Sequence, residues 1–294
     1  MKRMSRGDRA MEIVFYVILS FLILICFYPI WYVIVASISD GDYVNSGAMI
    51  ILPRGIHFKG YTYAFHQKQL WIGYGNTVFY TVAGTIFGLA CTLPAGYALS
   101  RKDLPYKGII MAIFVFTMYF SGGMIPTYIV VYTLKLTNTR WILILFGSIS
   151  VYNMIMIRTF CMANIPEELR ESASIDGCGN GRFFFQFVIP LAKPIIAVIA
   201  LYIAVGHWNN YYNALVYTQD TSLQPLQMYL RKLLFINIGV EASNDDAADV
   251  AEIKKLVQVV KYCVIVLSSL PIMTVYPFLQ KYFVQGVMIG SIKG

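Results

Sequence analysis

The sequence predicts an all-α integral membrane protein with six transmembrane helices and a short polar helix in the loop between the fourth and fifth. Two observations concern composition: 58% of the residues are hydrophobic and only 13% are charged. In an average soluble domain about 25% of the residues are charged. The third observation is that six charge-free runs reach 17 residues or more, and about 20 apolar residues span a bilayer core.

The charge-free runs locate the spans. They comprise residues 13–39, 69–100, 108–134, 141–157, 194–219 and 262–280. The fourth run is short, but apolar residues on both sides extend it. We therefore predict a single transmembrane domain over residues 1–294, with a cytoplasmic coupling loop at 162–193. Its spans are expected at about 12–38, 72–99, 108–132, 141–161, 194–217 and 260–281.

Three of the spans carry local features. The first run is too long for the apolar region of a cleaved signal peptide, and no small-residue cleavage site follows it, so we expect it to be retained. In the second, Gly84 and Gly88 have the spacing that permits close helix contacts in lipid. In the third, the sequence Ser121-Gly122-Gly123, followed by Pro126, predicts a kink.

Lysine and arginine residues set the predicted orientation. Four basic residues precede the first span, and the short loop between spans two and three holds three more: Arg101, Lys102 and Lys107. Because cytoplasmic loops are enriched in these residues, we expect a multi-pass protein of the bacterial plasma membrane with both termini in the cytoplasm. The net charge of +8 suits anionic lipid headgroups. No basic face is concentrated enough to predict nucleic-acid binding.

The loop after span four encodes a polar helix. Asn164 can cap its start, Pro166 suits its first turn, and Gly177 suits its end because glycine accepts a left-handed backbone. Three acidic residues favour the positive N-terminal end of the helix dipole: Glu167, Glu168 and Glu171. A helix lying on the membrane surface is the alternative, but such helices favour lysine and arginine. The acidic composition therefore favours docking to an aqueous protein partner.

The spacing in this loop resembles the EAA motif of permease subunits of ATP-binding-cassette (ABC) importers. That motif reads Glu-Ala-Ala, three residues, Gly, nine residues, Ile, one residue, Leu-Pro. The matching positions here are Glu171, Ser172, Ala173, Gly177, Phe187, Ile189 and Pro190. Ser172, Phe187 and Ile189 depart from the motif but roughly keep size or apolarity.

Other stretches extend the resemblance over nearly the whole chain, to carbohydrate-type importer permeases such as the maltose permease and to their YtcP/LplC-like subgroup. They are Gly7-Asp8-Arg9, Asn76-Thr77, residues 95–101, residues 121–126, Asn138-Thr139 and Trp208-Asn209.

The resemblance implies a mechanism and a set of partners. A cytoplasmic ATPase would hold the 166–177 helix in a groove, and closure of two ATPase subunits would move that helix as a lever, so that the spans open alternately to each side. The docking residues implied are Glu167, Glu171, Ser172, Ala173, Asp176 and Gly177. The other implied partners are a second, homologous permease subunit forming a heterodimer, and an extracytoplasmic solute-binding protein.

The chain itself is predicted not to be an enzyme. Gly177, Gly179 and Gly181 form a Gly-x-Gly-x-Gly run, but no Gly-Lys-Ser/Thr follows it and no strand is expected before it, as a phosphate-binding loop requires. ATP and Mg²⁺ are therefore expected on the partner ATPase, with no cofactor in this chain. The five cysteines have no metal-binding spacing, so no metal site is expected.

Span five contains the candidate substrate pathway. Its aromatic rings and amides suit the C–H faces and hydroxyls of sugars. The candidates are His207, Trp208, Asn209, Asn210, Tyr211 and Asn213. Helical spacing would place His207, Asn210 and Tyr211 on one face. An interfacial aromatic belt with amides that bridge helices is the alternative for this cluster.

No charged residue lies at the centre of a predicted span, which argues against an ion-coupled secondary carrier and for a neutral solute. The sequence thus predicts a permease subunit of an importer for oligosaccharides or related neutral saccharides. Two alternatives stay open: a permease for a non-sugar solute, and a membrane receptor or scaffold whose cytoplasmic helix recruits a protein without transport.

Overall fold

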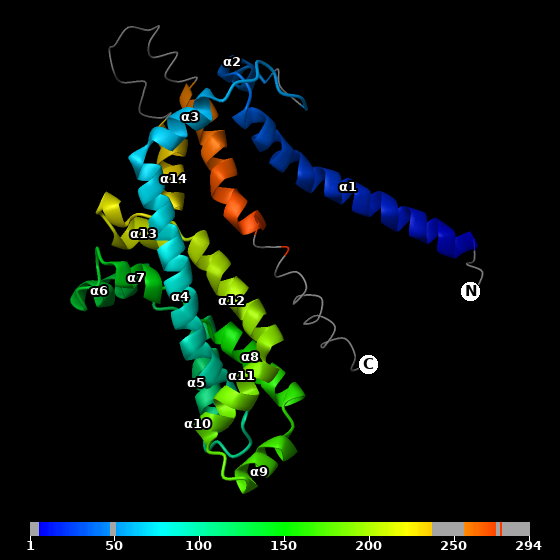
Figure 1. Ribbon diagram of the computed structural model, residues 1–294, viewed down its shortest axis with the longest axis vertical. Coiled ribbons are helices and arrows are strands. Elements are labelled where there is room, and N and C mark those ends of the chain that lie inside the picture. The colour runs from blue at the N-terminus through cyan, green and yellow to red at the C-terminus, as the bar shows by residue number, and fades with distance from the viewer. Residues whose placement is uncertain (1–5, 48–50, 237–255, 275–276, 278–294) are drawn as a thin grey trace. The chain divides into compact units, whose positions relative to one another are not determined.

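The computed structural model of the protein describes residues 6–47, 51–236, 256–274 and 277 (Figure 1). Every element in these ranges is helical, which confirms the all-α prediction. The first seven are α1 (Arg6–Ser37), α2 (Gly41–Asn45), α3 (Lys59–His66), α4 (Lys68–Ser100), α5 (Lys107–Tyr119), α6 (Met124–Thr133) and α7 (Arg140–Leu145). Next come α8 (Val151–Asn164), α9 (Glu167–Ile175), α10 (Asn180–Phe183), the π-helix η1 (Phe184–Val188) and α11 (Ile189–Leu191). They are followed by α12 (Lys193–Trp208), α13 (Tyr212–Tyr217), the 3₁₀-helix η2 (Thr221–Leu223), α14 (Leu226–Ile236) and a last helix, Leu256–Thr274.

Three described helices are long and apolar enough to cross a membrane by themselves: Met11–Ser37, Lys68–Ser100 and Leu256–Thr274. Two further segments qualify only when a bent pair of helices counts as one span. These pairs are Lys107–Tyr119 with Met124–Thr133, bent by 111°, and Asn180–Leu191 with Lys193–Trp208, bent by 82°. The described residues therefore hold three to five candidate spans, and the predicted count of six is not confirmed.

The region predicted as span four divides into two helices, α7 and α8. The chain between them turns at Gly147, whose φ of +90° is one that glycine adopts at little cost. With 6 and 14 residues, neither helix is long enough by itself to cross the bilayer core. The predicted sixth span ends at residue 281, and residues 275–276 and 278–281 of it lie outside the described residues.

The predicted kink in span three is confirmed. Helix α5 ends at Tyr119 and α6 begins at Met124, with a bend of 111° between them. Gly123, just before α6, has a φ of +85°. Pro126 lies in the first turn of α6, where its missing N–H removes no helical hydrogen bond.

The described residues pack into two compact units, with chain divisions after Lys68, Tyr229 and Leu270. In the first unit, Val35, Ala36 and Val44 form a small core. The Ser37 hydroxyl lies 2.8 Å from the Tyr61 hydroxyl, and Cys263 Sγ donates a hydrogen bond to the Ser37 carbonyl over 3.2 Å. Among the described residues, the 18-residue apolar stretch that makes α1 a candidate span has no buried side chain.

The second unit is built around α4, which packs closely on its neighbours through glycines. A Cβ atom on Gly84 would overlap the His207 ring of α12, and one on Gly88 would overlap the Ser148 carbonyl oxygen. A Cβ on Gly96 would lie 2.7 Å from Ile157 Cγ2 of α8. The close packing predicted for Gly84 and Gly88 is therefore present, and its partners belong to the same chain.

Two cores lie along the second unit. The one nearer the start of α4 joins α4, α7 and α13, and its buried members are Tyr80, Val131, Ile142, Leu143, Ile144, Ala214, Tyr217 and Met228. The other joins the last part of α4 to α8, α9 and α12. Its buried members are Tyr97, Ile157, Cys161, Ala173, Phe183, Val188, Ala192, Ile195, Ile199 and Ile203. Helix α9 thus lies at one end of the unit and shares its core (Figure 1).

Candidate functional site

Helix α9 forms where the sequence predicted a polar helix, but it begins differently. Pro166, in an extended conformation, precedes the first helical residue, Glu167, and no side chain caps this end. The prediction that Asn164 caps it is wrong, because α8 continues through Asn164 and its Nδ2 donates to the Phe160 carbonyl over 2.9 Å.

The other end of α9 is closed as predicted. Gly177 has a φ of +77°, and its N–H donates to the Ser174 carbonyl over 3.1 Å. The Cys178 N–H donates to the Ala173 carbonyl over 2.9 Å. This pair of hydrogen bonds is the Schellman arrangement, which satisfies carbonyls that a helix end would otherwise leave free. The chain therefore leaves α9 in a fixed direction.

The two sides of α9 differ in chemistry. Ala173 is buried, and Leu169 packs against the same core. The opposite side, called here the outer face, is exposed and consists of Glu168, Glu171, Ser172, Ile175, Asp176 and Gly177. Ile175 is 87% exposed, so the outer face combines carboxylates with an apolar side chain at its end.

Of the six predicted docking residues, four lie on the outer face and two do not. Glu171, Ser172, Asp176 and Gly177 are exposed. Glu167 is partly buried and bonds Arg170 of the same chain. Ala173 is buried in the chain's own core, so its small side chain allows α9 to pack closely within the permease and not against a partner. Sequence reasoning left Ile175 out because an exposed isoleucine cannot be told from a buried one by residue type alone.

A group of five polar residues joins α9 to the loop between α4 and α5. Arg101 donates from Nε and Nη2 to the Asp103 carboxylate, over 2.8 and 2.5 Å, and from Nη1 to Asn180 Oδ1 over 2.6 Å. Arg170 donates from Nε to Glu167 Oε1 over 2.5 Å, and its Nη1 lies 3.8 Å from Asp103 Oδ2. We call Arg101, Asp103, Glu167, Arg170 and Asn180 the polar network.

The polar network holds Asp103 in its charged form. Hydrogen bonds from the Arg101 guanidinium lower the pKa of Asp103 from 3.8 to about 2. A carboxyl whose pKa is depressed in the folded state contributes stability above its ordinary pKa and loses it as the pH falls through the folded value. The network is therefore fully formed at neutral pH and weakens only between about pH 4 and pH 2.

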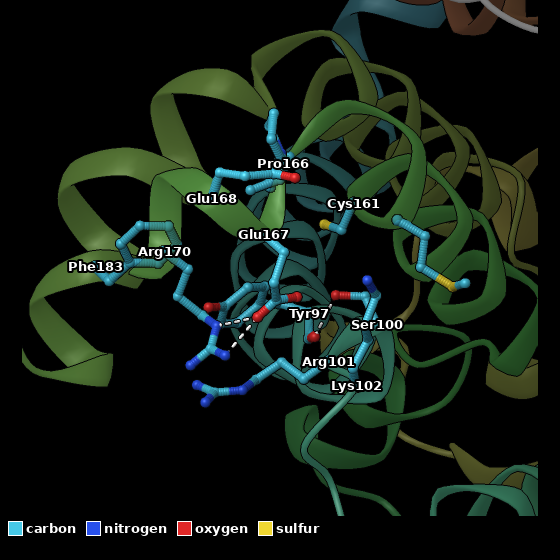
Figure 2. A pocket seen from close by; sticks show the side chains of 12 residues that line it. Tyr97, Ser100, Arg101, Lys102, Cys161, Pro166, Glu167, Glu168, Arg170 and Phe183 are labelled. Carbon is cyan, nitrogen blue, oxygen red and sulfur yellow. Dashed lines mark hydrogen bonds and ion pairs between the residues drawn. The ribbon is translucent and has the colours of Figure 1, made fainter. Parts of the chain in front are cut away.

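A pocket of about 290 Å³ lies beside the polar network, where α4 ends and α9 begins (Figure 2). Figure 2 shows Glu167 and Arg170 bonded on one side of it, with the Arg101 and Lys102 side chains beside them. Its charged lining is mixed in sign, with three cations and two carboxylates: Arg101, Lys102, Arg170, Glu167 and Glu168. Mixed charges do not favour a small ion of either sign.

The residues predicted to line a substrate path do not form one helical face. Helix α12 ends at Trp208, so the prediction that His207, Asn210 and Tyr211 share a face is wrong. Asn209 and Asn210 cause the break: Asn209 Nδ2 donates to the Val205 carbonyl over 3.0 Å, and Asn210 Oδ1 accepts from the N–H of residue 213 over 3.2 Å. Such side-chain bonds to backbone compete with helix continuation.

These six residues divide into a buried and an accessible group. His207 is 3% exposed, lies against Gly84 and contacts the Ser148 hydroxyl at 3.0 Å, while Trp208 is buried as well. Asn209 and Tyr211 are exposed, and Asn210 and Asn213 are partly buried. The structure therefore assigns His207 to helix packing and leaves the residues after Trp208 accessible.

Sequence reasoning missed a second polar cluster, at the start of α4. Four α4 side chains bond the backbone of residues 221–226. Gln69 Nε2 donates to the Thr221 carbonyl over 2.7 Å, and Asn76 Nδ2 donates to the Ser222 and Gln224 carbonyls over 2.7 and 3.1 Å. The Tyr80 hydroxyl donates to the Leu223 carbonyl, and Thr77 Oγ1 accepts from the Leu226 N–H, both over 2.8 Å. The signal was the pair Asn76-Thr77, two polar residues within an apolar run, which the sequence-based prediction used only as part of the family resemblance.

Comparison with known proteins identifies the family. No protein-family model matches the chain. It is 37% identical over 287 residues to the polygalacturonan/rhamnogalacturonan transport system permease protein YtcP of Bacillus subtilis (strain 168), covering 98% of this chain and 99% of the relative. The chain belongs to the carbohydrate-type permeases of ABC importers. This permease is also 39% identical over 266 residues to protein LplC of the same organism, covering 90% of this chain and 89% of LplC.

A solved structure supports the same assignment. The permease matches a chain in the crystal structure of a bacterial ABC transporter involved in the import of the acidic polysaccharide alginate, with a TM-score of 0.86 and 34% identity. The match covers 96% of this permease and 100% of that chain. Together with its apolar helices, this makes the protein a multi-pass membrane permease and not an enzyme.

Proposed function

We propose that this permease is a subunit of an ATP-driven importer of oligosaccharides, and that α9 is the coupling helix on which a cytoplasmic ATPase docks. The observation that carries the proposal is the two-sided character of α9. Its outer face presents carboxylates and Ile175 to the surroundings, while Ala173 and Leu169 join it to the core shared with α4, α8 and α12. A force on the outer face therefore reaches the membrane helices directly.

The proposed assembly follows the pattern expected of the family. A second, homologous permease completes the pathway, two ATPase subunits bind ATP and Mg²⁺, and an extracytoplasmic binding protein delivers the saccharide. Both termini and α9 lie in the cytoplasm, on the side where Arg101, Lys102 and Lys107 are concentrated. ATPase closure moves α9 and switches the spans between inward-open and outward-open states.

The transported solute is proposed to be an oligosaccharide. YtcP is named for polygalacturonan and rhamnogalacturonan transport, and the structural relative takes part in alginate import. The absence of charges from the centres of the predicted spans favours a neutral saccharide, whereas alginate is acidic. Uptake assays should therefore compare neutral and acidic oligosaccharides of equal length.

The exposed part of the span-five cluster supports a role in the substrate path. Tyr211 is 44% exposed and its ring is available for stacking on a sugar. We expect Tyr211→Ala to raise the Km for uptake about fivefold, the equivalent of about 1 kcal/mol of lost aromatic contact. The measurement is saccharide uptake into proteoliposomes across a concentration series. Tyr16→Ala, at an exposed tyrosine of α1, is the matched control, and equal Km values for the two variants would remove Tyr211 from the path.

Charge reversal on the outer face tests the docking proposal. We expect Glu171→Arg to reduce the ATPase recovered with the tagged, co-expressed permease at least tenfold, because a buried contact to a carboxylate becomes a repulsion. The second permease should still be recovered. The measurement is affinity purification of the co-expressed neighbours with quantitative mass spectrometry.

Glu12→Arg, which makes the same change at an exposed glutamate of α1, is the control for general charge effects. Normal ATPase recovery with Glu171→Arg would contradict docking on this face. Absence of an ATPase from the wild-type sample would contradict the importer proposal and favour a receptor or scaffold that recruits another protein.

A further inference from the structure

We propose that Arg101 is a positioning residue that transmits the movement of α9 to α4 and α5. This inference rests on the proposed function, because it assumes that an ATPase moves α9. Its basis is the polar network, in which one guanidinium joins the loop between α4 and α5 to the segment that follows α9, 79 positions away in the sequence. Arg101 directly follows α4, Asp103 lies in the loop leading to α5, and Asn180 begins the helix that follows the turn after α9.

The contacts of Arg101 are directional. Nε and Nη2 bond the two oxygens of Asp103, at 2.8 and 2.5 Å, and Nη1 bonds Asn180 Oδ1 at 2.6 Å. A guanidinium presents donors in a rigid planar fork, so these bonds fix the orientation of both partners as well as their distance. A lysine ammonium carries the same charge but has no fork. The pattern therefore requires arginine and not merely a cation.

The network contacts α9 at both of its ends. At the start, Arg170 bonds Glu167 and approaches Asp103, with 3.8 Å between Nη1 and Oδ2. Beyond the end of α9, the turn at Gly177 leads to Asn180, which Arg101 holds. The Lys107 Nζ donates to the Arg101 carbonyl over 3.1 Å and so joins the first residue of α5 to the same point.

Burial distinguishes a positioning role from a simple surface ion pair. The Arg101 side chain is only 15% exposed, whereas Asp103 is 49% exposed. Exposed ion pairs add little net stability because water screens them. Because Asp103 is half exposed, screening by water limits what the network adds to the folding free energy, while the shielded guanidinium keeps α9 and the α4–α5 loop in a constant relative position when α9 moves.

The test separates transmission from assembly and from folding. The complex is purified with its ATPase subunits and reconstituted in proteoliposomes, and saccharide uptake and ATP hydrolysis are measured on the same sample. For Arg101→Gln we expect retained ATPase subunits, an unchanged Km for the saccharide, and at least a fivefold lower uptake per ATP hydrolysed. Arg101→Lys should show the same loss because it lacks the fork, and Asp103→Glu should keep near-normal coupling because it keeps the carboxylate.

Lys102→Gln is the matched control, since Lys102 is exposed and, within the described residues, forms no ion pair with Asp103 or Glu167. Unchanged uptake per ATP in Arg101→Gln would overturn the inference. Loss of the ATPase subunits from that variant would overturn it as well, by showing that the network supports docking itself. If wild type binds no ATPase, the proposed function fails independently of Arg101.

A second measurement, which needs no ATPase, distinguishes a variant with a local loss of positioning from one that couples poorly because it folds poorly. Hydrogen–deuterium exchange of the permease in detergent should show faster exchange for residues 101–107 and 166–180 together in Arg101→Gln. Helices α12 and α13 should be unchanged. Faster exchange confined to residues 101–107, or spread over the whole second unit, would overturn the positioning role.

Discussion

Replacing Gly88 with valine is expected to leave no correctly folded permease in the membrane. A Cβ atom at this position overlaps the Ser148 carbonyl oxygen and lies 2.8 Å from Ile203 Cδ1. The isoleucine can change rotamer, but the carbonyl belongs to the backbone of the turn between α7 and α8 and has no rotamer to change. Overpacking costs about 1–3 kcal/mol when side chains can adjust, and the rigid neighbour puts this substitution at or above the upper end.

The matched control is Gly75→Val on the same helix, where no described atom lies within 4 Å of the added Cβ. Both substitutions put the same residue into α4, so helix propensity and β-branching cancel. Fluorescence-detected size-exclusion chromatography of detergent extracts should give a monodisperse peak and a near-normal melting temperature for Gly75→Val, and aggregate for Gly88→Val. Equal melting temperatures would show that α4 and the Ser148 turn are not packed as described.

The helices were predictable where the sequence signal is local and strong. Long charge-free runs located α1 and α4 because no charged residue interrupts them. The run at 141–157 is equally free of charge, yet it folds as α7 and α8 with a turn at Gly147. A glycine in an apolar run is compatible with a helix or with a turn. Here the turn places the backbone of the next residue, Ser148, against Gly88 of α4, a contact that no local pattern predicts.

The candidate site likewise has features that a local sequence pattern predicts and features that only the fold creates. The Schellman end of α9 was predictable because one glycine supplies the left-handed backbone that it needs. The polar network was not predictable, because Arg101 and Asn180 are 79 positions apart and only the fold brings them together. The direction in which each α9 residue points was also undetermined, so Glu167 and Ala173 were grouped with residues that lie on the outer face.

Replacing Gly177 with aspartate is expected to reduce saccharide uptake to background while the permease still inserts and folds. A Cβ at Gly177 meets no described atom within 4 Å, so the substitution causes no steric clash. The φ of +77° disfavours a side chain, but aspartate and asparagine tolerate this region better than other residues, at a cost of about 1 kcal/mol. The fold should therefore survive.

Function should not survive, because the new carboxylate lies beside Asp176 on the outer face and at the negative C-terminal end of the α9 dipole. An ATPase surface matched to one carboxylate there would meet two. Gly177→Asn isolates this effect, since it has nearly the same shape and backbone preference without the charge, and it should retain most of the uptake. The measurement is uptake together with saccharide-stimulated ATP hydrolysis in proteoliposomes.

The comparison of these two variants decides which property of Gly177 the importer needs. If only aspartate abolishes uptake, the outer face makes an electrostatically matched contact. If aspartate and asparagine fail equally while both proteins fold, the charge argument is wrong. The absence of a side chain at Gly177 would then be the essential feature, because a side chain at this exposed position would keep a docked ATPase away from α9.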